Sequence, residues 1–209
     1  MSRVKVLYVE DDPDWREGIK RFLSSYAEID LVACVSTIAD CKEQLDTEHA
    51  DIIIMDIILD EYGLSGLEGT LDLSSLYPHI KIIMLSSLDE DDDIFNEAFL
   101  NGAYDFVYKN EFEQLPHIIS TAMKNPTSKY GERLKKLVFE KKKSLLSEGD
   151  VIMLKLLLQD KTQTQIAEEL NVSIAAVKKQ VGRVKKKFNW DRSSKELASK
   201  CQKWGVLDS

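Results

Sequence analysis

Cysteine is scarce in this sequence and follows no pattern. Cys34, Cys41 and Cys201 are the 3 cysteines among 209 residues, and they form neither a CxxC pair nor a metal-ligand spacing. Unpatterned cysteines are typical of proteins kept in a reducing cytoplasm. We therefore expect each of them to be a small core residue.

Long apolar runs are also missing. No stretch approaches the ~20 apolar residues of a membrane-spanning helix, and the sequence starts directly with the strand-like VKVLYV instead of a cleavable leader. These absences predict a cytoplasmic protein with no membrane segment. What the sequence does have is length and apolar content: 209 residues, 44% of them hydrophobic, favour two modest domains with substantial cores.

Basic residues are few in the first part of the chain. Residues 1–127 carry 9 Lys+Arg against 26 Asp+Glu, a net charge of −17, whereas residues 128–209 carry 19 against 10, a net charge of +9. An acidic part joined to a basic part suggests two jobs, and the basic part is a candidate for binding nucleic acid. The alternative is that both parts simply expose solvated charged faces.

The acidic part alternates short apolar runs with amphipathic segments. The runs expected as strands are VKVLYV, LVACV, DIIIMDI, IKIIML and YDFVY. Helical periodicity follows over Asp14–Tyr26, Ile38–Glu48, Gly66–Tyr77, Asp91–Asn101 and Glu111–Lys124. This alternation predicts a doubly wound α/β domain, in which helices bury both faces of a five-stranded parallel sheet.

The pattern changes at KNPTSK, residues 124–129, where proline and small polar residues interrupt it. We expect the α/β domain over residues 1–124, a partly helical linker over 125–145 and a smaller all-α domain of four helices over 146–209. Its expected helices are Glu148–Gln159, Thr162–Glu169, Ser173–Phe188 and Ser193–Lys203. The expected N-caps are Ser147, Thr162, Ser173 and Ser193.

Chemically distinctive residues end four of the expected strands. Glu10 and Asp11 end the first, Asp56 the third, Ser86 the fourth and Lys109 the fifth. In a parallel sheet these ends share one edge, where three carboxylates raise one another's pKa values unless a cation relieves them. Oxygen ligands alone select a hard cation such as Mg²⁺. The sequence therefore predicts a magnesium site at this edge.

Acidic residues are also favoured at helix N-termini, without any metal. This alternative suits Asp12 and Asp14, and it suits DEDDD, residues 89–93, at the start of the fourth expected helix. It does not explain Asp56 or Lys109, which follow strands.

Five motifs, in order, resemble the receiver domain of bacterial two-component response regulators. They are YVEDDPDWREGI, DIIIMDI, GLSGLE, IIMLSS and GAYDFVYK, and the resemblance covers about residues 1–124. It implies a flavodoxin-like fold with Asp56 as phospho-acceptor. It further implies Mg²⁺ ligands at Glu10, Asp11, Asp56 and the backbone carbonyl of Ile58, a switch pair of Ser86 and Phe106, and a phosphate-pairing Lys109.

The chemistry expected from these residues is self-modification, so we do not expect an enzyme. Asp56 would attack a phosphoryl group as a carboxylate nucleophile, while Mg²⁺ and Lys109 neutralise the developing charge. Ser86 would then approach the phosphate, and Phe106 would rotate inward. The sequence departs from the family in the loop IILDEYGLSG, which is longer than usual and has Asp60 at the usual proline position.

The basic part contains a helix, a tight turn at residues 171–173 and a second helix. One face of the first helix is expected to carry Ile166, Ala167 and Leu170, and one face of the second Ile174, Val177, Val181 and Val184. The rest of the second helix carries Lys178, Lys179, Arg183, Lys185, Lys186 and Lys187. An apolar stripe backed by a basic stripe suits a helix that enters the DNA major groove. The alternative is a solvated lysine-rich helix.

Residues Leu146 to Leu207 resemble the four-helix DNA-binding domain of the NarL/LuxR type. The resemblance implies that Lys178 and Lys179 contact bases, and that Arg183, Lys185 and Lys186 contact phosphates. The departures are Glu148 for a common proline, Asp150 for a common glutamate, Gln180 for a frequent histidine and Gly182 for a frequent polar residue.

We therefore predict a phosphorylation-dependent, DNA-binding transcription regulator of a two-component phosphorelay. The expected partners are a sensor histidine kinase, double-stranded DNA and a second copy of the chain when phosphorylated, with RNA polymerase as a further candidate. One alternative is a receiver whose basic helices bind RNA or protein. The other is a phosphatase with an aspartate nucleophile, which Ile58 opposes because such enzymes carry a second aspartate two residues after the nucleophile.

Overall fold

The computed structural model describes residues 3–59, 65–88, 91–128 and 131–208. The chain folds into two compact units, Met1–Lys136 and Leu137–Ser209, so the division lies inside the segment predicted as a linker. In these ranges, no helix combines the length and the apolar character needed to cross a membrane. The expected loop residue Asp60 lies outside the described residues.

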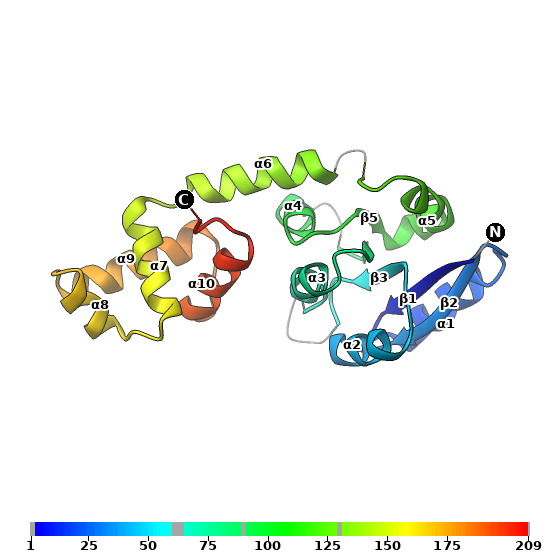
Figure 1. Cartoon of the computed structure of the whole chain (residues 1–209), viewed down its shortest axis with the longest axis horizontal. Coiled ribbons are helices and arrows are strands. Elements are labelled where there is room, and N and C mark those ends of the chain that lie inside the picture. Colours follow the sequence, from blue (N-terminus) through cyan, green and yellow to red (C-terminus); the bar gives the residue numbers. More distant parts are fainter. Residues whose placement is uncertain (1–2, 60–64, 89–90, 129–130, 209) are drawn as a thin grey trace. The chain divides into compact units, whose positions relative to one another are not determined.

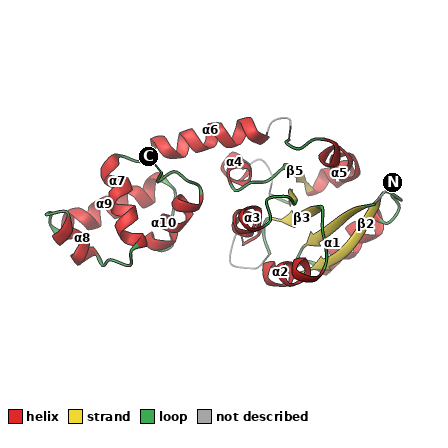
Figure 2. Ribbon diagram, in the orientation of Figure 1, coloured by secondary structure: helices red, strands yellow, loops and turns green. Residues whose placement is uncertain are grey.

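The first unit is built on a five-stranded parallel sheet (Figures 1 and 2). Its strands are β1 (Val4–Val9), β2 (Ile29–Val35), β3 (Ile52–Asp56), β4 (Lys81–Ser86) and β5 (Asp105–Tyr108). They lie in the order β2-β1-β3-β4-β5. The order reverses between β1 and β3, and in such sheets the carboxyl ends of the strands at this switch point form the binding site.

Helices cover both faces of the sheet. They are α1 (Pro13–Leu23), α2 (Ile38–Thr47), α3 (Ser65–Leu76), α4 (Asp92–Leu100) and α5 (Leu115–Lys124). Side chains alternate between faces along each strand: Leu7 and Ile53 pack with α2, α3 and α4, whereas Val6 and Ile52 pack with α1 and α5. The predicted fold class is confirmed.

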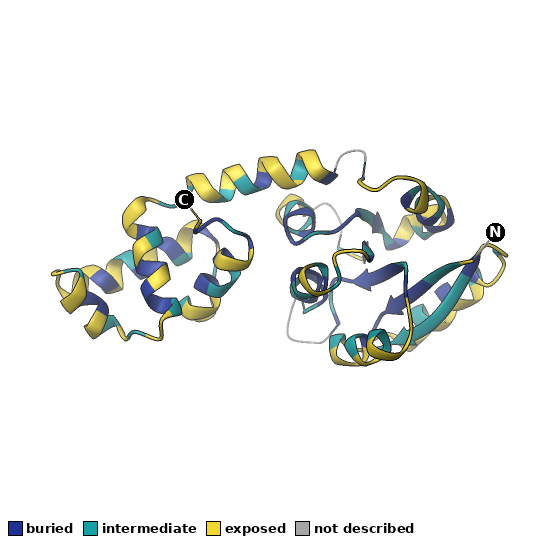
Figure 3. Ribbon diagram, viewed as in Figure 1, coloured by how far each residue is buried: buried dark blue, intermediate teal, exposed yellow. Residues whose placement is uncertain are grey.

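The two edge strands are less buried than the sequence predicted. All residues of β3 are buried, but most residues of β2 and β5 are only half-buried (Figure 3). The reason is position, because an edge strand has a neighbour on one side alone. The same effect leaves Cys34 on β2 half-buried, whereas Cys41 and Cys201 are core residues as expected.

One helix differs from the helix that the periodicity predicted, and the linker contains a helix of its own. The segment expected as one helix over Glu111–Lys124 consists of a 3-10 helix, η1 (Lys109–Gln114), followed by α5. The break coincides with Pro116 near the start of α5, where proline is tolerated because the first helical N–H groups have no partner. The linker contains α6 (Gly131–Ser144), and the two units divide within it.

The second unit contains α7 (Glu148–Leu158), α8 (Gln163–Glu169), α9 (Ile174–Lys187) and α10 (Ser194–Lys203). All four predicted N-caps are confirmed, because the side-chain oxygen of each accepts a backbone N–H in the first turn: Ser147, Thr162, Ser173 and Ser193. One core prediction is wrong: Val177, Val181 and Val184 are buried, but Ile174 is 43% exposed. Ile174 begins its helix, so α7 and α8 do not enclose it.

Candidate functional site

Three carboxylates meet at the carboxyl edge of the sheet. Glu10 and Asp11 follow β1, and Asp56 ends β3, the neighbouring strand. One ligand oxygen of each lies within 4.8 Å of the others. Glu10 and Asp56 are only 1% and 4% exposed, whereas Asp11 faces solvent. The structure therefore brings together the three side chains that the sequence grouped.

Lys109 supplies positive charge to this cluster from the end of β5. Its Nζ lies 2.7 Å from Oε2 of Glu10 and 3.2 Å from Oδ1 of Asp56. The ammonium also lies over the Trp15 ring, 4.9 Å from the centroid. One lysine thus bridges two buried carboxylates that would otherwise repel each other.

The balance of these charges leaves Asp56 unusually basic. Burial, and to a smaller extent the negative charge of Glu10, raise the pKa of its carboxyl to about 7, although Lys109 lowers it in part. A carboxylate whose pKa lies near 7 is a stronger nucleophile than an ordinary aspartate. Its ionised form is also stabilised more by an added cation. Its neighbourhood therefore suits both covalent chemistry and metal binding.

Two further residues fix Glu10, and the sequence analysis missed both. The Tyr8 hydroxyl donates to Oε2 of Glu10 at 2.8 Å, and burial beside Glu10 raises the pKa of Tyr8. Arg16 on α1 donates to the backbone carbonyls of Glu10 and Asp11 at 2.7 and 2.6 Å. The signals available in the sequence were a tyrosine in an aliphatic strand and an arginine one helical turn after the N-cap Asp12.

Gly66 also belongs to the site, although in the sequence it indicated only a motif and the start of a helix. A Cβ built on it would lie 1.7 Å from the backbone oxygen of Asp56, and its N–H donates to the Ile57 carbonyl at 3.0 Å. The start of α3 therefore touches the end of β3 backbone to backbone. Only glycine permits this approach without a shift of the chain.

The predicted switch residues lie on the two strands beyond Asp56. Ser86 ends β4, is fully buried, and accepts the backbone N–H of Leu88 at 3.0 Å. Phe106 on β5 is half-buried, with its ring centroid 5.2 Å from that of Phe95 on α4. Ile58, whose backbone carbonyl was predicted as a metal ligand, lies two residues after the end of β3 and is half-buried.

A second polar cluster lies in the other unit, around Asp150 of α7, which is completely buried. Its carboxylate accepts hydrogen bonds from Gln180 at 3.0 Å, Arg183 at 2.8 Å and Lys187 at 3.1 Å, all on α9. Burial alone would raise the pKa of Asp150, but the bonds from Arg183 and Gln180 outweigh it and lower the pKa. The cluster fixes the second helix of the helix-turn-helix against α7.

This arrangement divides the basic residues of α9 into two groups. Lys178, Lys179 and Lys186 are exposed. Arg183 is committed to Asp150 through one nitrogen, with its side chain still 56% exposed, and Lys185 donates to the Asp191 carbonyl at 3.2 Å. Lysines on the exposed face are therefore the freest to meet an anionic ligand.

Comparison with known proteins agrees with both halves of this description. Residues 6–120 match the family model of the response regulator receiver domain, and residues 144–200 match that of the bacterial regulatory proteins of the luxR family. The response regulator protein VraR of Staphylococcus saprophyticus is 27% identical over 191 residues, which cover 88% of this chain and 90% of VraR. DegU of Brevibacillus brevis is 28% identical over 108 residues, covering 52% of this chain and 44% of DegU.

Solved structures show the same fold. The RcsB response regulator of Salmonella typhimurium superposes with a TM-score of 0.56 at 20% identity, covering 96% of this chain and 98% of RcsB. The receiver domain of NarL from Mycobacterium tuberculosis gives a TM-score of 0.53 at 22% identity. The match covers 60% of this chain and 100% of that domain. The chain thus belongs to the two-component response regulators, with a receiver domain followed by a helix-turn-helix DNA-binding domain of the luxR family.

Proposed function

We propose that Asp56 accepts a phosphoryl group from a sensor histidine kinase in the cytoplasm, and that this event controls DNA binding by the second domain. The observation that carries the proposal is the convergence of Asp56, Glu10, Asp11 and Lys109 at the switch point of the sheet. A chain that joins such a site to a basic helix-turn-helix can couple phosphorylation to DNA binding.

Phosphoryl transfer to Asp56 is a displacement at phosphorus. An Asp56 carboxylate oxygen forms the new bond to phosphorus, and the bond between phosphorus and the donor atom breaks, with its electron pair leaving on the donor. Negative charge spreads over the phosphoryl oxygens in the transition state. The Lys109 ammonium, 3.2 Å from Oδ1 of Asp56, is placed to balance that charge.

The residues present also suit Mg²⁺. Glu10, Asp11 and Asp56 offer carboxylate oxygens at the spacing of one ion, and oxygen-only ligands match a hard cation. The backbone carbonyl of Ile58 is the fourth proposed ligand. When bound, Mg²⁺ would supply positive charge that orients the phosphoryl group and offsets the repulsion between the carboxylates.

The proposed signal leaves the site through Ser86 and Phe106. The Ser86 hydroxyl can move toward a new phosphate and donate to it, which would lengthen the bond that its oxygen accepts from Leu88. Phe106 contacts Phe95 on α4, so a change in its rotamer alters the surface of α4 and β5. Phosphorylation of Asp56 would in this way change the protein surface at α4 and β5.

The proposed DNA contacts are those of a recognition helix in the major groove. Lys178 and Lys179 contact base edges near the start of α9, whereas Arg183, Lys185 and Lys186 contact phosphates. Arg183 can do this while bonded to Asp150, because a guanidinium offers five N–H donors. One such helix covers a single half-site, so we propose a homodimer of the phosphorylated chain, and RNA polymerase is a candidate partner at promoters.

The experiment that tests the acceptor uses intact-mass measurement with Mg²⁺ and a small acyl phosphate. The wild-type chain should gain one acid-labile phosphoryl group, and Asp56→Asn should gain none. A matched control is Asp51→Asn, which removes an aspartate from the opposite end of β3. Equal labelling of Asp56→Asn and wild type would refute the assignment.

A further inference from the structure

Tyr8 is a polar residue in an apolar place. It lies on β1 with no exposed surface and packs among Val6, Ile54 and Leu85 on the face covered by α1 and α5. A buried hydroxyl is unfavourable without a hydrogen-bond partner. The partner is Glu10, because side chains two residues apart point to the same side of an extended chain.

The two oxygens of Glu10 are used very unequally. Oε2 accepts the Tyr8 hydroxyl at 2.8 Å and also the Lys109 ammonium at 2.7 Å. Oε1 accepts only a long contact of 3.4 Å from the backbone N–H of Asp12, among the bonds to described residues. The protein therefore holds the carboxylate by one oxygen and leaves the other for a ligand.

Lys109 is closer to Glu10 than to Asp56, at 2.7 Å against 3.2 Å. A phosphoryl group adds strong negative charge at Asp56 and so draws the ammonium toward itself. Oε2 of Glu10, a residue only 1% exposed, would then lose its charged hydrogen-bond donor, while Oε1 stays available to the proposed Mg²⁺. Such a loss is costly for a buried carboxylate unless another donor remains.

We propose that Tyr8 is a positioning residue for phosphoryl transfer: its hydroxyl keeps Glu10 hydrogen-bonded and in place while Lys109 moves to the phosphoryl group on Asp56. This inference rests on the proposed function of Asp56 and deepens it. Tyr8 touches no reacting atom, and it acts through Glu10 alone. It makes the release of Lys109 from Glu10 easier.

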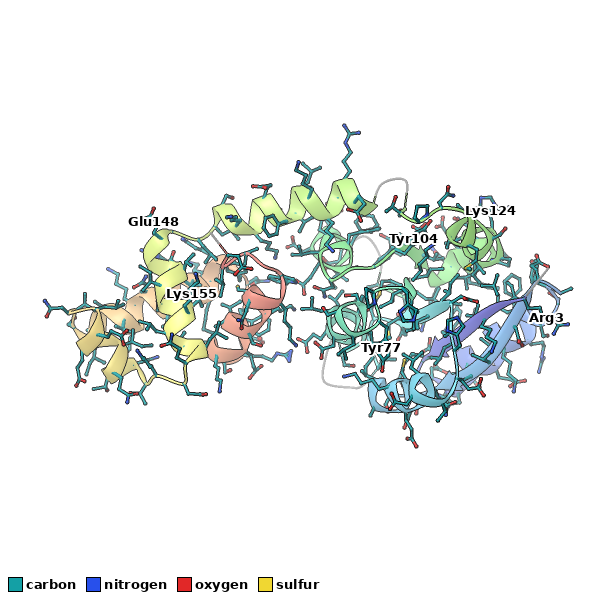
Figure 4. The ribbon with its side chains drawn as sticks, in the orientation of Figure 1. Arg3, Tyr77, Tyr104, Lys124, Glu148 and Lys155 are labelled. Carbon is teal, nitrogen blue, oxygen red and sulfur yellow. The ribbon has the colours of Figure 1, made fainter. Side chains whose placement is uncertain are left out.

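The test compares Tyr8→Phe with Tyr104→Phe. Each change removes one hydroxyl from a buried tyrosine of the same domain, but Tyr104 (Figure 4) donates to the carbonyls of Asn125 and Thr127 instead. With saturating Mg²⁺ and acetyl phosphate, Tyr8→Phe should take up phosphate on the order of tenfold more slowly than wild type. Tyr104→Phe should match wild type.

A second background separates a positioning role from a packing role. In Glu10→Asp the shorter side chain keeps an acid at the site but withdraws its oxygens from the Tyr8 hydroxyl. Adding Tyr8→Phe to that variant should change the rate less than about twofold, because the contact is already lost. Equal slowing by Tyr8→Phe in both backgrounds would overturn the proposal.

Fluorescence of Trp15 gives a readout that does not depend on rate. Its ring lies against Lys109, so its emission, taken as the difference from Trp15→Phe, should change when Lys109 leaves. The change on full phosphorylation should be smaller in Tyr8→Phe than in wild type. An undiminished change together with an unaltered rate would refute the role of Tyr8. Failure of the wild type to be labelled at all would instead refute the proposed function.

Discussion

The environment that raises the pKa of Asp56 also lowers the stability of the folded protein when Asp56 is ionised. Its pKa is raised from 3.8 to about 7 by burial and by Glu10, so the folded state binds its proton more tightly than the unfolded state. Its contribution to the free energy of unfolding therefore falls as the pH rises from about 4 through about 7. The site resembles many catalytic sites in having less stability than its fold would allow.

A direct consequence is that removing the charge should stabilise the metal-free protein. We expect Asp56→Asn to raise the free energy of unfolding at pH 8 on the order of 2 kcal/mol. The gain should shrink as the pH falls toward 4. Urea denaturation of both chains in the presence of a chelator, at several pH values, measures this. A destabilised variant at pH 8 would contradict the electrostatic account.

Gly66 makes a prediction that concerns shape alone. A methyl group there would overlap the backbone oxygen of Asp56, 1.7 Å away, so Gly66→Ala must displace either α3 or the end of β3. We expect a loss of about 2 kcal/mol or more in stability, together with slower phosphorylation. Gly18→Ala on α1 is the control, because a Cβ there meets nothing within 4 Å. Equal behaviour of the two variants would show that the close approach does not matter.

Ile58 and Leu88 bear on how long the phosphorylated state lasts. They lie two residues after the proposed acceptor Asp56 and two after Ser86, and both are half-buried apolar side chains that cannot orient a water. Polar groups that orient a water typically contribute ~10²-fold in rate. We therefore expect slow self-dephosphorylation, and faster decay in Ile58→Asn and Leu88→Glu. Loss of phosphate followed by mass would decide, and unchanged decay in both variants would refute the shielding.

Among the elements, α9 depends on α7 for its orientation. Asp150 binds Gln180, Arg183 and Lys187, and its lowered pKa means that this contribution is present above the unfolded pKa near 4 and is lost as the pH falls further. Asp150→Asn removes the negative charge that these donors bind, so we expect it to destabilise the second domain. The loss should be limited to about 2 kcal/mol, because Arg183 and Lys187 are partly exposed and can form hydrogen bonds with water instead. Denaturation followed by the emission of Trp190 and Trp204 tests it, with Asp160→Asn as the surface control.

The elements also show what the sequence could and could not predict. Apolar runs and N-caps placed the strands and helices to within a few residues, because burial and capping are local signals. The grouping of Glu10, Asp56 and Lys109 followed from the rule for parallel sheets. The roles of Tyr8 and Gly66 were not predicted, because they depend on distances across the fold that the sequence does not give. Ile174 was misplaced because periodicity does not tell where a helix leaves the core.

At the scale of the whole molecule, the two parts of the chain carry opposite net charges. The segment with a net charge of −17 contains Asp56, the proposed acceptor, and the segment with +9 contains α9, the proposed recognition helix. Binding of a basic domain to DNA releases counterions, so its affinity must fall with salt. Phosphorylation of Asp56 would add negative charge to the acidic segment, and we expect it to affect DNA binding through a change in protein conformation or assembly.

The central claim is that phosphorylation of Asp56 controls DNA binding, and one measurement tests it directly. Duplexes selected from a random pool would be titrated with phosphorylated and unphosphorylated wild type at two salt concentrations, with Asp56→Asn treated in the same way. We predict that phosphorylation tightens wild-type binding about tenfold or more, that salt weakens it, and that Asp56→Asn gains nothing. Equal affinity of the two wild-type forms would contradict the account.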